Sequence, residues 1–170
     1  WIPTFSEYAD ACRLHAHRVE GISSVEALTE EEGICWLCNP NNPTGQTWEA
    51  DTLRRLITQY PRTLFVIDQS YALFTEKKVL SVVETVVRPN VLLLHSMTKC
   101  FAVPGLRLGA VTGNEALLQW IRACRMPWSV NALAVEAGQY LLRHLDEYRM
   151  EVPALLAERK RVAEALEATG

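Results

Sequence analysis

The sequence has no apolar run near the roughly 20 residues that a membrane-spanning helix requires. Its first residues show no charged start followed by an apolar segment, the pattern of a secretory signal peptide. Lysine and arginine total 17, they are scattered, and the net charge is -3, so no basic surface for nucleic acid is predicted. We therefore expect a cytoplasmic protein that binds neither membranes nor nucleic acid.

Cysteine is present in an odd number, five residues spread from Cys12 to Cys124, which is unlike a disulfide-stabilised domain. We expect free thiols. Cys35 and Cys38 form a Cys-x-x-Cys pattern inside the apolar run 34–38, where alternation places them on opposite faces of a strand. This pattern predicts buried structural cysteines and no metal site.

The chain has 170 residues, 49% of them apolar, which is enough for one globular domain with a core. Short apolar runs predict strands at 18–22, 34–38, 63–67, 91–94 and 108–112. Helical spacing of apolar residues predicts helices at 7–17, 49–60, 115–125, 131–145 and 152–168. The alternation indicates a three-layer α/β/α fold with a mostly parallel sheet. Because the sequence starts at Trp1 and ends within a charged helical pattern, we expect a fragment.

Polar residues follow directly after three of the predicted strands, at the carboxyl ends where parallel α/β proteins bind ligands. The candidate residues after the strand predicted at 34–38 include Asn42, and those after 63–67 are Asp68 and Tyr71. Those after 91–94 are Ser96, Thr98, Lys99 and Arg107.

Lys99 is one of only four lysines, with hydroxyl residues before it and a single arginine eight positions later. A partly desolvated lysine loses its proton more easily and then forms an imine with an aldehyde. The alternative interpretation is an ordinary surface lysine on a loop.

An electron-sink cofactor also needs a carboxylate at its ring nitrogen, donors to its ring oxygen, and cationic and hydroxyl groups at its phosphate. Asp68 would serve the ring nitrogen, and Asn42 and Tyr71 the ring oxygen. The phosphate would be held by Ser96, Thr98 and Arg107. A structural salt bridge between Asp68 and Arg107 is the alternative for that pair.

Four motifs occur in a characteristic order: Asn42-Pro43-Thr44-Gly45, Asp68-x-x-Tyr71, Ser96-x-Thr98-Lys99 and Gly105-Leu106-Arg107-Leu108-Gly109. This order resembles the signature of class I/II (fold-type I) aminotransferases. The resemblance implies pyridoxal 5'-phosphate (PLP) bound as a Schiff base on the catalytic residue Lys99, with the roles given above. It also implies that residues 1–170 form the PLP-binding core of the large domain, and that the intact enzyme is a homodimer.

Within that family, the doubled Asn-Pro-Asn-Asn-Pro-Thr-Gly is similar to histidinol-phosphate aminotransferases and to threonine-phosphate decarboxylases of cobalamin biosynthesis. Pro104 and the segment 126–134 favour the decarboxylase, whereas Gln69-Ser70 departs from the usual Glu-Ala. We expect a PLP-dependent lyase acting on an amino-acid phosphate. The alternatives are an aminotransferase, a non-catalytic ligand-binding domain of a regulator, or a fragment inactive by itself.

The same resemblance leads us to expect further site residues outside this chain. These are a glycine-containing phosphate loop and an aromatic residue that stacks on the cofactor, both upstream, and an arginine for the substrate carboxylate in a small domain downstream.

Overall fold

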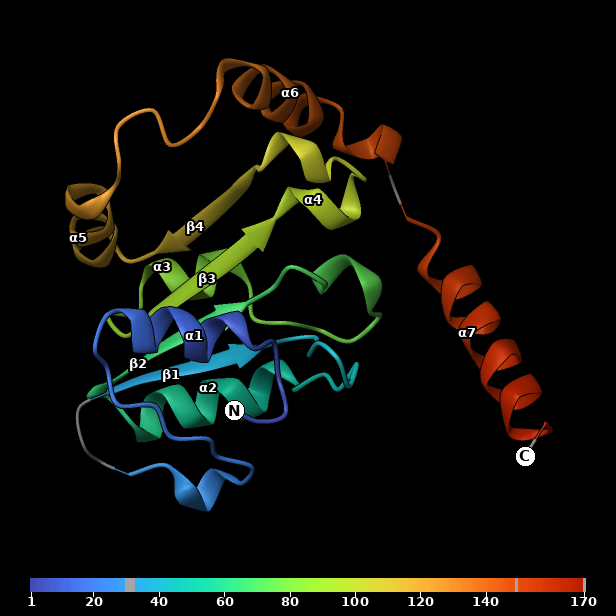
Figure 1. The fold of residues 1–170 in the computed structure, drawn as a ribbon, viewed down its shortest axis with the longest axis horizontal. Helices are drawn as coiled ribbons and strands as arrows, with labels where there is room; N and C mark the ends of the chain where they lie inside the picture. Colours follow the sequence, from blue (N-terminus) through green and yellow to red (C-terminus); the bar gives the residue numbers. More distant parts are fainter. Residues whose placement is uncertain (30–32, 149, 170) are drawn as a thin grey trace.

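The computed structural model describes residues 1–29, 33–148 and 150–169 (Figure 1). Its centre is a four-stranded sheet of β1 (Gly33–Cys38), β2 (Thr63–Asp68), β3 (Val91–Ser96) and β4 (Gly109–Gly113), in that spatial order. β1, β2 and β3 are parallel to one another, and β4 runs antiparallel to β3. The expectation of a mostly parallel sheet is therefore confirmed.

Helices cover both faces of this sheet (Figure 1). The helices are α1 (Glu7–Leu14), α2 (Ala50–Gln59), α3 (Val82–Val86), α4 (Met97–Cys100), α5 (Glu115–Cys124), α6 (Ala132–Arg143) and α7 (Val152–Glu167). α1 lies on one face, where Tyr8 stacks on Trp36 of β1, and α2 packs on the other. The α/β class with flanking helices is confirmed. Within the described ranges, no helix combines the length and the apolar character needed to cross a membrane.

The main core lies between α2 and the sheet. Phe65 and Ile67 of β2 are fully buried against Leu53 and Ile57 of α2. Successive residues of a strand point to opposite faces, so the odd-numbered positions of β1, β2 and β3 form this core and the even-numbered ones face α1. The packed face fixes the strands, and with them the loops at their ends.

The two cysteines of the Cys-x-x-Cys pattern are separated as predicted. Cys35 belongs to the α2 core, whereas Cys38 lies on the opposite face and donates a hydrogen bond through Sγ to the Pro40 carbonyl at 3.2 Å. All five cysteines are free thiols.

Two predictions of secondary structure are wrong in detail. Residues 18–22 form no strand, because a strand needs a row of hydrogen bonds to a neighbour, and this segment is joined to the N-terminal residues by a bond from Ile2 N to Ile22 O at 2.8 Å. The first helix ends at Leu14 rather than at position 17, since Ala16 adopts the left-handed conformation with φ 58°.

Replacing Phe65 tests the core that positions the strand ends. Phe65 is 0% exposed, so Phe65→Ala should lower the free energy of unfolding by about 3–5 kcal/mol, because it leaves a cavity. Leu73 is 52% exposed and provides the control, for which Leu73→Ala should change it by less than about 0.5 kcal/mol. Urea denaturation followed by circular dichroism measures both, and equal losses would contradict the assigned burial.

Candidate active site

Hydrogen bonds extend the parallel pairing to the last residues of the three strands. Asn39 N donates to Asp68 O at 2.8 Å, and Gln69 N donates to Leu94 O at 2.8 Å. The carboxyl ends of β1, β2 and β3 therefore lie side by side, and the loops that carry the predicted residues leave from one edge of the sheet.

The fourth strand returns to the same edge. Because β4 is antiparallel to β3, its first residue Gly109 pairs with Ser96, the last residue of β3. Met97 N donates to Leu108 O at 3.2 Å, so the segment carrying Arg107 runs beside the start of α4. The structure thus brings the Ser96–Lys99 turn and Arg107 into one neighbourhood.

Asp68 is half-buried, and both oxygens of its carboxylate are held. Oδ2 accepts a hydrogen bond from the Tyr8 hydroxyl at 2.6 Å. Oδ1 accepts from the backbone N of Ser70 at 2.8 Å and from Ser70 Oγ at 2.5 Å. The salt bridge considered as an alternative, between Asp68 and Arg107, is absent from the described ranges.

Tyr8 and Ser70 are contacts of Asp68 that the sequence did not predict. An Asp-x-Ser pattern is a local signal, because aspartate side chains commonly bond the backbone two residues on. Tyr8 gives no such signal, since it lies 60 positions from Asp68 in the sequence. Burial, together with the bond to Asp68, raises the pKa of Tyr8 above its ordinary value, so the phenol remains a hydrogen-bond donor.

Ser96 and Thr98 form a hydroxyl pair at the start of α4. Ser96 Oγ accepts from the backbone N of Thr98 at 3.3 Å, and the two side-chain oxygens lie 2.7 Å apart. Lys99, next in the same turn, is exposed while Met97, Thr98 and Cys100 are half-buried. None of the described elements covers this side chain, so the partial desolvation considered for Lys99 stays a prediction.

Arg107 follows a short 3₁₀ turn and adopts the left-handed conformation, with φ 54° and ψ 49°. Its side chain is exposed, and Nη1 donates to the Pro104 carbonyl at 3.0 Å. A left-handed conformation costs an arginine roughly 1–2 kcal/mol, and residues held in this way cluster at functional sites. Arg107 is one of four non-glycine residues with positive φ in the described ranges, and of these it is the one that the motif had indicated.

The Asn-Pro-Asn-Asn-Pro-Thr-Gly loop is braced by its first two asparagines. Asn39 is 0% exposed and bonds both backbone groups of Trp48, from Nδ2 to O at 3.2 Å and from N to Oδ1 at 2.7 Å. Asn41 Nδ2 donates to Pro3 O at 2.8 Å, and its Oδ1 accepts from Thr4 Oγ1 at 2.7 Å. Neither amide is then available to a ligand.

The third asparagine of that loop, Asn42, is half-buried and follows the braced residues directly. Tyr71 is also half-buried and packs edge-on against Phe74, with ring centroids 5.8 Å apart. Both come from loops that begin at the same edge of the sheet as Asp68.

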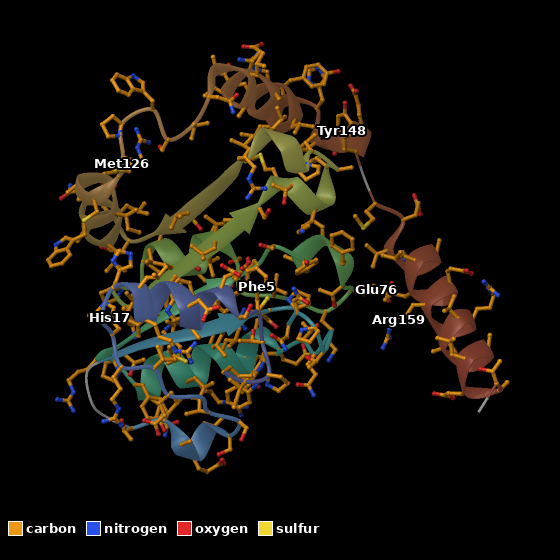
Figure 2. The ribbon with its side chains drawn as sticks, in the orientation of Figure 1. Phe5, His17, Glu76, Met126, Tyr148 and Arg159 are labelled. Atoms are coloured by element: carbon orange, nitrogen blue, oxygen red, sulfur yellow. The ribbon has the colours of Figure 1, made fainter. Side chains whose placement is uncertain are left out.

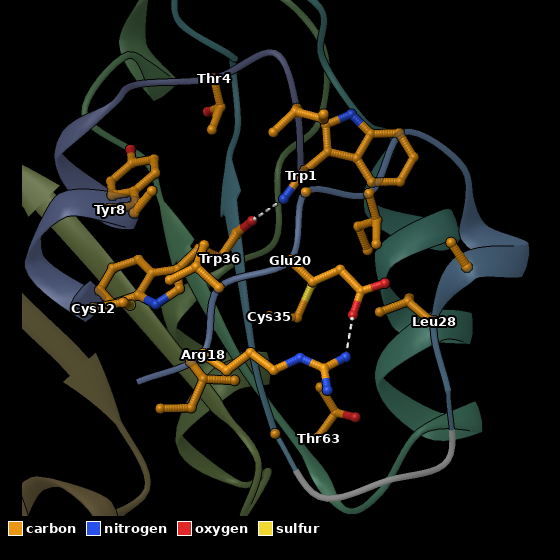
Figure 3. Close-up of a pocket in the computed structure, with 18 of the residues that line it drawn as sticks. Trp1, Thr4, Tyr8, Cys12, Arg18, Glu20, Leu28, Cys35, Trp36 and Thr63 are labelled. Atoms are coloured by element: carbon orange, nitrogen blue, oxygen red, sulfur yellow. Dashed lines mark hydrogen bonds and ion pairs between the residues drawn. The ribbon is translucent and has the colours of Figure 1, made fainter. Parts of the chain in front are cut away.

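A cavity of about 480 Å³ lies elsewhere, between the free edge of β1 and the N-terminal segments (Figure 3). Its lining includes Trp1, Cys12 and Trp36, and Trp1 N donates to Trp36 O at 3.0 Å. Tyr8 also lines it, but no residue predicted for the site does. Phe5 lines it as well, so the cavity adjoins the strand ends on the α1 side but is lined by none of the predicted site residues.

His95 lies directly before Ser96, and its Nε2 is 3.0 Å from Thr112 Oγ1 of the neighbouring strand. Burial lowers the pKa of His95, and the charge of Asp68 opposes this in part. The folded protein therefore disfavours the protonated imidazole.

The lowered pKa of His95 gives a pH dependence of stability. The contribution of neutral His95 to folding stability is complete above its pKa in the unfolded chain, near 6.5. It is lost as pH falls below that pKa, because the unfolded chain takes up a proton there more readily than the folded protein does. Urea unfolding at pH 7.5 and 5.5 should show a smaller loss for His95→Gln than for the unchanged protein. The exposed His17 serves as control, since His17→Gln should leave the loss as it was; identical losses in all three proteins would disprove the prediction.

Comparisons with known proteins agree in indicating one family. The family model described as aminotransferase class I and II matches residues 2–170. The chain is 30% identical over 184 aligned positions to a histidinol-phosphate aminotransferase of Desulfitobacterium hafniense, covering 98% of this chain and 50% of the relative.

Two solved structures show the same arrangement of elements. The L-threonine-O-3-phosphate decarboxylase of Porphyromonas gingivalis superposes with a TM-score of 0.85 at 35% identity, covering 90% of this chain and 48% of that one. A histidinol-phosphate aminotransferase of Sinorhizobium meliloti, in complex with pyridoxal 5'-phosphate, gives a TM-score of 0.69 at 21% identity, with 76% and 36% covered. The chain thus spans half or less of the length of these proteins.

Proposed function

The chain belongs to the class I and II aminotransferase family, and on this premise we propose that residues 1–170 form the PLP-binding core of a PLP-dependent enzyme acting on a phosphorylated amino acid. One observation carries the proposal. The carboxylate of Asp68 is held at the end of β2, next to the strand whose end leads into the Lys99 turn.

The side chains at the strand ends suit the chemical groups of this cofactor. Asp68 offers a charged acceptor to the N–H of a protonated pyridine, and Lys99 offers an amine to the aldehyde carbon. Asn42 and Tyr71 would donate to the ring oxygen. The phosphate would be bound by the Ser96 and Thr98 hydroxyls and by the guanidinium of Arg107.

When bound, PLP supplies an electron sink for whichever bond at the substrate Cα is broken. The residues of this chain would orient the ring and move a proton. Asp68 keeps the ring nitrogen protonated, because a carboxylate beside it favours the cationic form. Lys99 would donate a proton to Cα in a decarboxylation, as the protonated ammonium, or would remove one from Cα in a transamination, as the neutral amine.

The proposed reaction is decarboxylation, as in the threonine-phosphate decarboxylases of cobalamin biosynthesis, in the cytoplasm. The similarity to the Porphyromonas gingivalis decarboxylase supports it. A histidinol-phosphate-type aminotransferase is the second candidate, supported by the Desulfitobacterium hafniense relative. Both would take a phosphate-bearing substrate. A regulator that binds PLP without catalysis is the third.

Phe5 is a candidate for the aromatic residue that we expected to find upstream of this chain. Its ring lies edge-on to Tyr8, with centroids 5.6 Å apart, and the side chain is 43% exposed. It precedes α1 at the end of the sheet toward which the parallel strands point (Figure 2). We propose that Phe5 packs against the cofactor ring.

A homodimer is part of the proposal. The segment between α5 and α6 carries large apolar side chains that no described element covers, with Met126 74% and Trp128 97% exposed (Figure 2). Exposed apolar surface of this kind marks association sites. Sedimentation of the intact protein should give twice the mass of one chain, and Trp128→Ser should shift it toward the monomer; a monomeric intact protein would refute the dimer.

Covalent labelling tests the cofactor and its site. PLP added to the intact protein and reduced with borohydride should leave a pyridoxyl mass on the peptide that contains Lys99. The label should disappear in Lys99→Ala and persist in Lys160→Ala, which alters an exposed lysine paired with Glu164 on α7. A label on other lysines, unchanged in Lys99→Ala, would refute the assignment.

The PLP-loaded intact protein, before any borohydride reduction, then separates the candidate reactions. Carbon dioxide released from O-phospho-L-threonine indicates the lyase. Glutamate formed from histidinol phosphate and 2-oxoglutarate, without release of carbon dioxide, indicates the aminotransferase. A protein that carries the Lys99 label and turns over neither substrate is the non-catalytic alternative.

A further inference from the structure

Hydrogen bonds from the protein already occupy most of the acceptor positions of the Asp68 carboxylate. A carboxylate offers about four lone-pair positions, two on each oxygen. Two hydrogen bonds from Ser70 occupy Oδ1, and one from Tyr8 occupies Oδ2. Among the described residues no other donor to this carboxylate is recorded, which leaves one position on Oδ2.

The two sides of this arrangement differ in origin. The Tyr8 hydroxyl comes from α1, and stacking of its ring on Trp36, with centroids 5.2 Å apart and planes at 15°, fixes its position. Ser70 lies two residues after Asp68, and its backbone N–H bond to Oδ1 is one that any residue except proline could form. The bond from Ser70 Oγ, at 2.5 Å, requires a hydroxyl side chain.

We infer that the hydroxyl of Ser70 is a positioning group, which fixes the plane of the Asp68 carboxylate so that the free position on Oδ2 meets the ring N–H of the cofactor. The inference rests on the proposed function. Without the hydroxyl, Oδ1 keeps one of its two bonds and Oδ2 keeps the bond from Tyr8. The plane of the carboxylate is then held less tightly about the Cβ–Cγ bond, so the acceptor is directed less well toward the ring.

The matched variants are Ser70→Ala, which removes only the hydroxyl, and Ser70→Thr, which restores it. Ser23→Ala is the control for loss of an exposed serine hydroxyl. Tyr8→Phe removes the other hydroxyl donor and leaves the aromatic stack on Trp36 in place. Melting of each protein without cofactor verifies that the variants are folded.

The experiment compares two ligands that differ at one ring atom. Equilibrium dialysis measures the Kd of the intact apoprotein for PLP and for its 1-deaza analogue, in which a C–H replaces the ring nitrogen. Ser70→Ala should weaken PLP binding about tenfold, the scale of one hydrogen bond to a charged group, and leave the Kd of the analogue unchanged. Ser70→Thr should recover the tight binding of PLP.

Three outcomes would overturn the inference while the proposed function stands. An unchanged Kd for PLP in Ser70→Ala would overturn it, and so would equal weakening of PLP and the analogue, which would make the role of Ser70 merely structural. Tighter PLP binding in Ser70→Ala would mean that the hydrogen bond from the hydroxyl only weakens the carboxylate as an acceptor for the ring N–H. Failure of the unchanged protein to bind PLP at Lys99 would instead refute the proposed function, and this inference with it.

Discussion

The hydrogen bonds that continue the parallel pairing of β1, β2 and β3 to their final residues determine the rest of the candidate site. Asp68 is central to them, because its backbone carbonyl receives Asn39 N while the next residue, Gln69, donates to Leu94. Gln69 is itself buried and bonds the Leu80 carbonyl through Nε2 at 2.8 Å. With the backbone fixed on both sides, only the side chain of Asp68 is free to be oriented.

That side chain is oriented from the face of the sheet opposite the main core. The α2 face is closely packed and apolar, and it makes the sheet a rigid support. The α1 face contributes a polar contact, since the hydroxyl of Tyr8 donates a hydrogen bond to Asp68, 60 positions away in the sequence. A division of this kind, with stability on one face and ligand chemistry at its edge, suits a site in which the bound group must be held at a fixed angle.

In the loops around Asp68, some polar side chains brace the backbone and others do not. Asn39 and Asn41 brace the loop through their side-chain amides, and the half-buried Asn42 follows them. On the other side, the Ser96–Thr98 hydroxyl pair and the left-handed Arg107 bring polar groups to one turn. Lys99 stands exposed beside them, in a chain that spans about half the length of its relatives.

The sequence by itself predicted the four strands of the sheet, the five longer helices and the residue types at the strand ends, but not the short helices α3 and α4. Apolar runs closed by Asn42, Asp68 and Ser96 are local signals, because a buried strand must end where polar groups can be satisfied. Period-two alternation was likewise enough to separate Cys35 from Cys38.

Tertiary structure alone decided which groups touch. The bond of Tyr8 to Asp68, the failure of residues 18–22 to form a strand and the exposure of Lys99 all depend on neighbours distant in the chain. Local patterning carries no record of such neighbours, because burial and hydrogen bonding are set by what packs against a residue rather than by its own type.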